Sequence, residues 1–138
     1  MKIKDLKVNP STVGMTSSAS PKREVLILAY NATITYEDGS KKRKRVDIDT
    51  PLLPKSAYKG CAFGASYFII IHQDAYYVFS SLFEFKNKIP LSSGKIVAVE
   101  ADLFGLRQEN MLIIYSNIGL IVDKRELTAE EITALDSN

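Results

Sequence analysis

The chain has 138 residues, close to the usual size of one domain, so a single hydrophobic core is the default expectation. Hydrophobic residues make up 46% and charged residues 25%, which excludes a fully disordered chain, and a single cysteine excludes a disulfide scaffold. The longest uncharged apolar run, residues 62–73, is too short to span a bilayer, and the polar residues after Met1 predict no secretory signal peptide. We expect a cytoplasmic or virion protein that does not enter a membrane.

Charge is unevenly distributed along the chain. Residues 1–60 carry 12 Lys or Arg against 6 Asp or Glu, whereas residues 61–138 carry 6 against 10. Five of the basic residues are consecutive, Lys41-Lys42-Arg43-Lys44-Arg45. This concentration predicts one local electrostatic contact rather than a basic coat over the whole surface. In a eukaryotic host the same run also resembles a monopartite nuclear-import signal.

Residues 1–24 are predicted to form an extended N-terminal arm, of which residues 3–8 half-alternate like a short strand. Ser and Thr fill six of positions 11–20, and apolar residues are sparse. Such a segment cannot bury enough apolar surface to offset the entropy of ordering it alone. We therefore expect the arm to lie on a neighbouring subunit, and residues 25–138 to form a single β domain.

The remaining elements are predicted mainly as strands. Residues 25–36 (VLILAYNATITY) are rich in β-branched residues, and the Asp38-Gly39 pair after them is a strong hairpin signal for a strand returning over residues 43–48. Residues 50–65 are predicted as a loop. Further apolar runs predict strands at 67–71, 76–80, 96–99, 111–115 and 120–122. Thr128 and Glu131 form a capping box that begins a short C-terminal helix over residues 128–136.

An internal repeat indicates how the strands are arranged. Residues 67–78 and 111–122 share one apolar hairpin pattern at a shift of 44, and residues 25–36 match it less well at a shift of 42. Three apolar hairpin units at this spacing predict an all-β, antiparallel fold, either of propeller-blade-like units or as a small barrel. The alternative interpretation is chance, because any antiparallel protein of this size contains several apolar hairpins. Residues 67–71 and 111–115 lack polar alternation and are predicted to be buried on both faces, by the fold or by a partner.

Residues suited to catalysis are scarce. His72 is the only histidine, which excludes a site of two histidines on one metal, and its place before a turn predicts a rim or turn residue. Cys61 lies among small and apolar residues and is predicted to be a buried hydrophobe. Asp47 and Asp49 share one strand face and are expected to pair with neighbouring Lys or Arg. We expect no enzyme, no metal and no cofactor.

The basic run is the principal candidate site. On a strand, Lys41, Arg43 and Arg45 face one way and Lys42 and Lys44 the other, so the hairpin is cationic on both faces. We predict a non-catalytic structural or interaction subunit of a larger assembly, such as a viral or phage particle, that contacts other protein subunits of a homo- or hetero-oligomer through the arm and this hairpin. The alternative is a module that binds nucleic acid or another polyanion with the same ribbon. A third interpretation is a solvated hairpin whose charges protect an edge strand. Aromatic residues do not interleave the run, so stacking of single strands is not predicted.

Overall fold

The computed structural model describes residues 1–17, 20–49 and 52–137, and within 15–24 it describes the backbone only. In these residues the chain forms three antiparallel four-stranded sheets and one short helix. The predicted all-β, antiparallel fold class is thus confirmed.

Each sheet is built from strands that are close in sequence. Sheet A has the order β1-β2-β3, with β4 also paired to β2; its strands are β1 (Ile3–Ser17), β2 (Ser20–Tyr36), β3 (Lys41–Val46) and β4 (Leu53–Pro54). Sheet B has the order of the chain, β5 (Tyr58–Phe63), β6 (Tyr67–His72), β7 (Ala75–Ser80) and β8 (Phe85–Pro90). Sheet C likewise contains β9 (Lys95–Val99), β10 (Leu103–Gln108), β11 (Met111–Ser116) and β12 (Ile121–Glu126). Short 3₁₀ turns at Lys55–Ala57 and Leu91–Ser93 precede β5 and β9, and α1 (Ala129–Asp136) follows β12.

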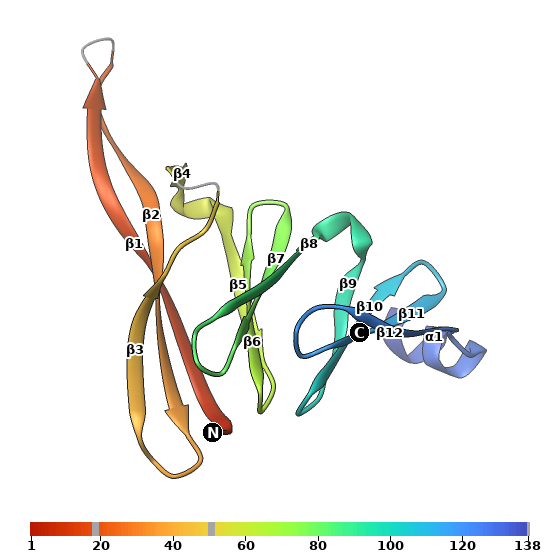
Figure 1. Ribbon diagram of the computed structural model, residues 1–138. Coiled ribbons are helices and arrows are strands. Elements are labelled where there is room, and N and C mark those ends of the chain that lie inside the picture. Colours follow the sequence, from red (N-terminus) through yellow and green to blue (C-terminus); the bar gives the residue numbers. More distant parts are fainter. Residues whose placement is uncertain (18–19, 50–51, 138) are drawn as a thin grey trace.

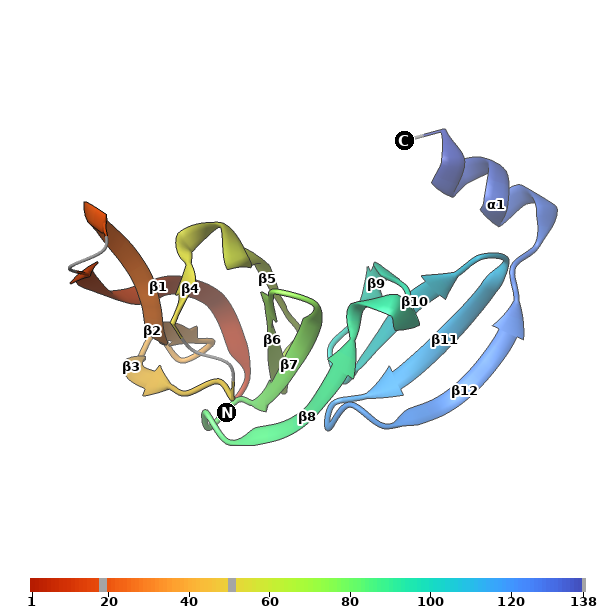
Figure 2. The same ribbon diagram turned by 90° about the horizontal axis from the view of Figure 1, so that it is seen from above.

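The three sheets are stacked, with sheet B between the other two (Figures 1 and 2). One apolar cluster joins residues of sheets A and B, and a second joins residues of sheets B and C. In the described part of the chain no strand pairs with a strand of another sheet. The arrangement therefore follows the propeller-blade-like alternative, and the small-barrel alternative is not realised.

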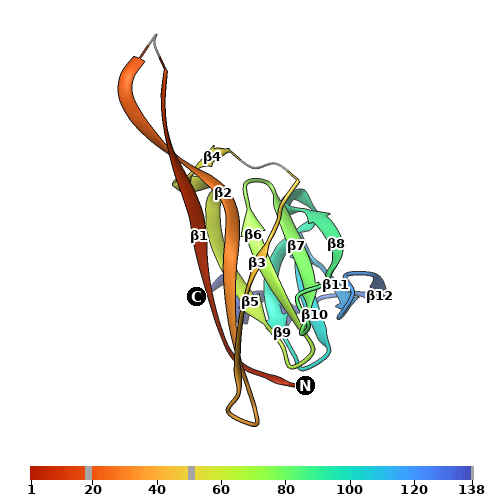
Figure 3. The ribbon, with the colours of Figure 1, turned by 60° about the vertical axis from the view of Figure 1, so that its left-hand side comes forward.

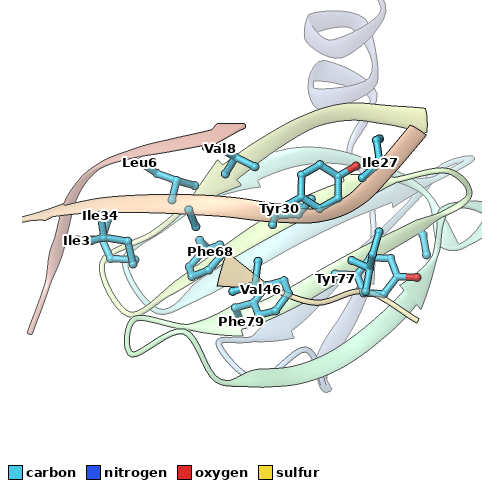
Figure 4. Packing of buried hydrophobic residues seen from close by; sticks show 14 of the residues in the cluster. Ile3, Leu6, Val8, Ile27, Tyr30, Ile34, Val46, Phe68, Tyr77 and Phe79 are labelled. Carbon is cyan, nitrogen blue, oxygen red and sulfur yellow. The ribbon is translucent and has the colours of Figure 1, made fainter. Parts of the chain in front are cut away.

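Strand β6 lies at the centre of the stack and is buried on both faces. Phe68 (Figure 4) and Ile70 belong to the cluster shared with sheet A, whereas Tyr67 and Ile69 belong to the cluster shared with sheet C, and all four are fully buried. The prediction of two-sided burial is confirmed for this strand. The cover comes from the same chain, so the apolar ribbon does not require a partner molecule.

Strand β11 shows the opposite outcome. Ile113 and Tyr115 are buried against sheet B, but Ile114 between them lies on the outer face of sheet C and is only partly buried. The prediction of two-sided burial is wrong here, because sheet C is the last layer of the stack. A run without polar alternation does not by itself show that both faces are covered.

The described part of residues 1–24 does not form a separate arm. Ile3–Ser17 pair with β2 along almost their whole length, and the predicted boundary between residues 24 and 25 lies inside β2. Ile3, Leu6 and Val8 are buried in the cluster between sheets A and B. Backbone pairing with β2 thus orders a Ser/Thr-rich segment that has few apolar side chains of its own. One end of the β1–β2 ribbon extends past the other strands (Figure 3); residues 18 and 19 lie outside the described part.

Two further predictions are corrected and one is confirmed. Residues 25–36 belong to one continuous strand rather than a hairpin, and residues 58–63, predicted within a loop, form β5. The capping box of α1 is present: the amide of Glu131 donates to Thr128 Oγ1 at 3.2 Å, and the amide of Thr128 donates to Glu131 Oε1 at 2.9 Å.

Candidate interaction surface

The basic run lies on β3, at one edge of sheet A (Figure 1). The β2–β3 turn is fixed by Asp38, whose Oδ1 accepts hydrogen bonds from the amide of Ser40 at 2.9 Å and its hydroxyl at 2.6 Å. The Ser40 hydrogen bond is also the main reason why the pKa of Asp38 is lowered. Gly39 has φ = 87°, which favours glycine. The predicted hairpin is therefore confirmed, and its turn sets the register of β3.

This register divides the five cations between the two faces of sheet A. Lys42 and Lys44 point toward sheet B, because they pair with the buried residues Ile34 and Ala32. The other three point to the outer face together with their partners on β2: Lys41 with Thr35, Arg43 with Thr33 and Arg45 with Asn31. All five basic side chains belong to exposed residues. The predicted alternation of cations is thus present in the sheet.

Strand β1 completes the outer face. Asp5, Lys7 and Asn9 are exposed and lie opposite the same three β2 residues, so three short rows of polar side chains cross the sheet. We call this surface the basic face and define it by its four cations, which are Lys7, Lys41, Arg43 and Arg45. Arg45 forms an exposed ion pair with Asp47 at 3.1 Å. Among the described residues, no carboxylate lies within ion-pair distance of the other three cations.

The side of β3 that faces sheet B meets aromatic side chains. Lys44 Nζ lies 5.9 Å from the centre of the Phe83 ring, in the loop between β7 and β8. On β8, Lys88 Nζ lies 5.4 Å from the centre of the Tyr77 ring. Cations over ring faces at these distances are attracted by the ring quadrupole. The edges of β3 and β8 therefore combine positive charge with aromatic surface.

Asp49 connects this edge to sheet B. The Tyr77 hydroxyl donates to Asp49 Oδ1, and Lys88 Nζ lies 3.1 Å from Asp49 Oδ2. The hydrogen bond from Tyr77, followed by that from Lys88, lowers the pKa of Asp49, and the bond to Asp49 raises the pKa of Lys88. The expected pairing with a neighbouring basic side chain is confirmed for Asp47, which pairs with Arg45. Asp49 pairs instead with Lys88, which lies far away in the sequence.

His72 is a core residue rather than a rim residue. Its side chain is fully buried, and its Nδ1 is hydrogen bonded to the Tyr30 hydroxyl at 2.7 Å across the interface of sheets A and B. Burial raises the pKa of Tyr30, so that phenol keeps its proton. His72 precedes the β6–β7 turn as predicted, but its pairing places the ring inside the stack.

Cys61 is exposed on β5, so the prediction of a buried hydrophobe is wrong. Strand β5 is an edge strand of sheet B, and this position is open to solvent.

Within the described ranges, no group of three His, Cys, Asp or Glu side chains is placed to hold a metal ion.

The outer face of sheet C is partly covered by α1. Arg125 binds Glu131 through two hydrogen bonds of 2.7 and 2.8 Å, and Arg107 binds Asp136 at 2.6 Å. The hydrogen bonds of Arg125, with those of Thr128, hold the pKa of Glu131 at about 2. Next to these arginines, Gly105 leaves a shallow apolar notch of about 170 Å³ between β9 and β11.

Comparisons with protein-family models, with curated proteins and with solved structures found no match. No helix in the part of the chain that the structure describes is long and apolar enough to cross a membrane.

The sequence alone identifies the cations of β3 but not the residues that lie around them in the fold. Lys7 joins the basic face only through the β1–β2 register, for which the half-alternation of residues 3–8 was the one available signal. Phe83 lies under Lys44 of β3 although it is about 40 residues away in the sequence. No local pattern in the sequence indicates that contact.

Proposed function

We propose that the protein is a non-catalytic interaction subunit of a larger assembly, such as a viral or phage particle, and that its basic face contacts an acidic surface of another component. One observation carries the proposal: four exposed cations share a single sheet face with only one carboxylate, Asp5, in the three rows that they occupy. Exposed charge of one sign attracts a partner of opposite sign and increases its rate of association.

A role in edge protection competes with this function. Charged side chains on an edge strand prevent it from pairing with other chains, and β3 is such a strand. Edge protection requires no partner and depends little on which face of the strand carries the charge. Binding through the basic face depends on the outer cations specifically.

Two variants with equal loss of charge separate these roles. K41Q/R43Q removes two cations from the basic face, and K42Q/K44Q removes two from the other side of the same strand. Binding of fluorescent poly-L-glutamate, measured by anisotropy at low salt, should weaken about 2- to 30-fold in K41Q/R43Q, since exposed ion pairs contribute about 0.2–1 kcal/mol each. Equal losses in both variants, or no binding by the wild type, would contradict a contact through the basic face.

Nucleic acid is the second candidate partner. It is favoured by the cations on both sides of β3, because a flexible polyanion can contact both sides of one strand edge. If about four phosphates are contacted, log K for a 20-mer single strand should fall with log salt at a slope of about −2.8. Binding that does not respond to salt would reject this candidate, whatever the result with poly-L-glutamate.

The assembly itself is tested by mass. Sedimentation of the full chain alone, and mixed with candidate acidic components, should give a complex heavier than the 15.4 kDa monomer only in the mixtures. A complex that survives in K41Q/R43Q would show that another surface makes the contact.

A further inference from the structure

We propose that the edge formed by β3 and β8 binds single-stranded nucleic acid by stacking a base on Phe85, an inference that rests on the nucleic-acid candidate above. We call this surface the aromatic edge and define it by Phe83, Phe85, Tyr77, Lys44 and Lys88. The proposal adds a ligand class and a contact residue that the basic run alone does not supply.

Phe85 has the properties of a stacking platform. It is 55% exposed, although its ring lies 5.9 Å from Phe79 and 6.3 Å from Tyr77, between ring centres. In sheet B it pairs with Phe79, whose side chain belongs to the core between sheets A and B. The ring is therefore supported from below by buried aromatic residues and still presents apolar surface to solvent. Aromatic rings in such positions bind unpaired bases of any sequence.

Cations lie on both sides of Phe85 along this edge. Lys44 over Phe83 marks one end, and Lys88 over Tyr77 marks the other. Phe85 lies between Phe83 and Lys88 in the chain and pairs with Phe79, two residues along β7 from Tyr77. Two residues of a strand span about 7 Å. A phosphate backbone following the edge therefore meets a cation before and after the exposed ring.

The neighbouring acidic residues leave a net positive edge. Asp49 offsets Lys88, and Glu84 pairs with Lys86 at 3.5 Å. Lys44 and Lys42, in contrast, have no carboxylate within ion-pair distance among the described residues. The attraction for phosphate thus comes chiefly from β3, while Phe85 on β8 supplies the surface for a base.

A single strand fits this surface better than a duplex or an acidic peptide. In a duplex the bases are stacked on one another and do not present a ring face to the protein. The tip of the β2–β3 hairpin also carries Glu37 and Asp38, which repel phosphates if the hairpin enters a groove. An acidic peptide supplies charge but no base, so Phe85 would add nothing specific to its binding.

The test compares oligonucleotides with and without bases. The full-length protein is titrated into fluorescent (dT)20, an abasic 20-mer of the same charge, and a 20-base-pair duplex at about 50 mM salt. We expect (dT)20 to bind most tightly. F85A should weaken binding of (dT)20 by about 5- to 150-fold and leave the abasic strand unchanged, which is the range for one stacked base. F85W should restore binding, and V122A serves as the control, since Val122 is also 55% exposed but lies on sheet C.

Each other outcome has a defined meaning. Equal affinity for (dT)20 and the abasic strand, or tighter binding of the duplex, overturns the stacking proposal. If K41Q/R43Q weakens every probe and F85A weakens none, the basic face functions as proposed and the aromatic edge does not. If F85A alone weakens (dT)20 and poly-L-glutamate does not bind, the aromatic edge stands and the contact with an acidic protein fails.

Discussion

Removing the Phe68 ring should be among the most destabilising single changes in this protein. Phe68 is fully buried on β6, stacked on Phe79 with ring centres 4.9 Å apart, and in edge contact with Phe83. Phe→Ala changes in cores cost about 3–5 kcal/mol. In a chain of this length 1 kcal/mol shifts Tm by about 4 °C, so Phe68→Ala should lower Tm by about 12–20 °C. Phe85→Ala removes the same ring from an exposed position and should cost less than about 1 kcal/mol.

The second half of this test concerns the other face of β6. Ile69 is fully buried in the cluster shared with sheet C, so Ile69→Ala should cost about 2–5 kcal/mol. Urea unfolding followed by circular dichroism gives both values, and repeating it at a tenfold higher protein concentration shows whether a second molecule contributes. We expect midpoints that do not depend on concentration. A loss below about 1 kcal/mol for either variant, or a midpoint that rises with concentration, would refute cover of β6 by sheets A and C of one chain.

Three further predictions concern single contacts. Because the pKa of Glu131 is held at about 2, its ion pair should stabilise α1 fully above about pH 4.5 and lose this effect as pH falls toward 2; in Glu131→Gln this acid transition, followed by helical circular dichroism, should disappear. Tyr30→Phe removes the buried hydrogen bond to His72 and should cost about 1–3 kcal/mol in urea unfolding, and a neutral result would show that this bond contributes nothing. Gly64→Ala places a methyl group against the Glu100 carbonyl oxygen and should lower the free energy of unfolding by about 1–3 kcal/mol. An unchanged Tm would mean that sheets B and C can move apart at this point at little cost in energy.

Local patterns in the sequence predicted the elements that local chemistry determines. The turn at Gly39 and the capping box of Thr128 each depend on residues within a few positions of one another. The 44-residue shift between the second and third hairpin units is also present, since β6 begins at Tyr67 and β11 at Met111. Apolar runs of this strength predict strands whatever their partners.

Strands that are ordered mainly by backbone pairing with a neighbouring strand were missed. Strand β8 contains Lys86, Lys88 and Pro90, a composition typical of edges and loops, and it is a strand because it pairs with β7. The fifteen residues of the expected arm that form β1, Ile3–Ser17, are ordered by the 17-residue strand β2. In both cases backbone hydrogen bonding to a neighbouring strand decides the structure, and the side-chain pattern shows at most the half-alternation of residues 3–8.

The candidate site, too, could be predicted where it depends on local sequence and not where it depends on packing. Alternation along β3 placed Lys41, Arg43 and Arg45 on one face correctly, because a strand has a period of two. The prediction that aromatic residues do not accompany the run holds along the sequence but not in space, since Phe83 of the β7–β8 loop lies under Lys44. That proximity follows from the packing of sheet A on sheet B.

The side chains on the two outer faces of the stack explain why no further apolar sheet packs on them. They also bear on where the proposed charged partner binds. Arg107 and Arg125 on the outer face of sheet C are hydrogen bonded to α1, whereas the basic face of sheet A carries four cations, short polar side chains and one carboxylate, Asp5. Packing another apolar sheet there would bury these charges, of which only Arg45 has a carboxylate within ion-pair distance among the described residues, and each unpaired charge would cost several kcal/mol. In the proposed contact, a polyanion or an acidic surface would meet these cations while they remain hydrated at the rim. The proposal therefore places the acidic partner on the face that ends the hydrophobic stack.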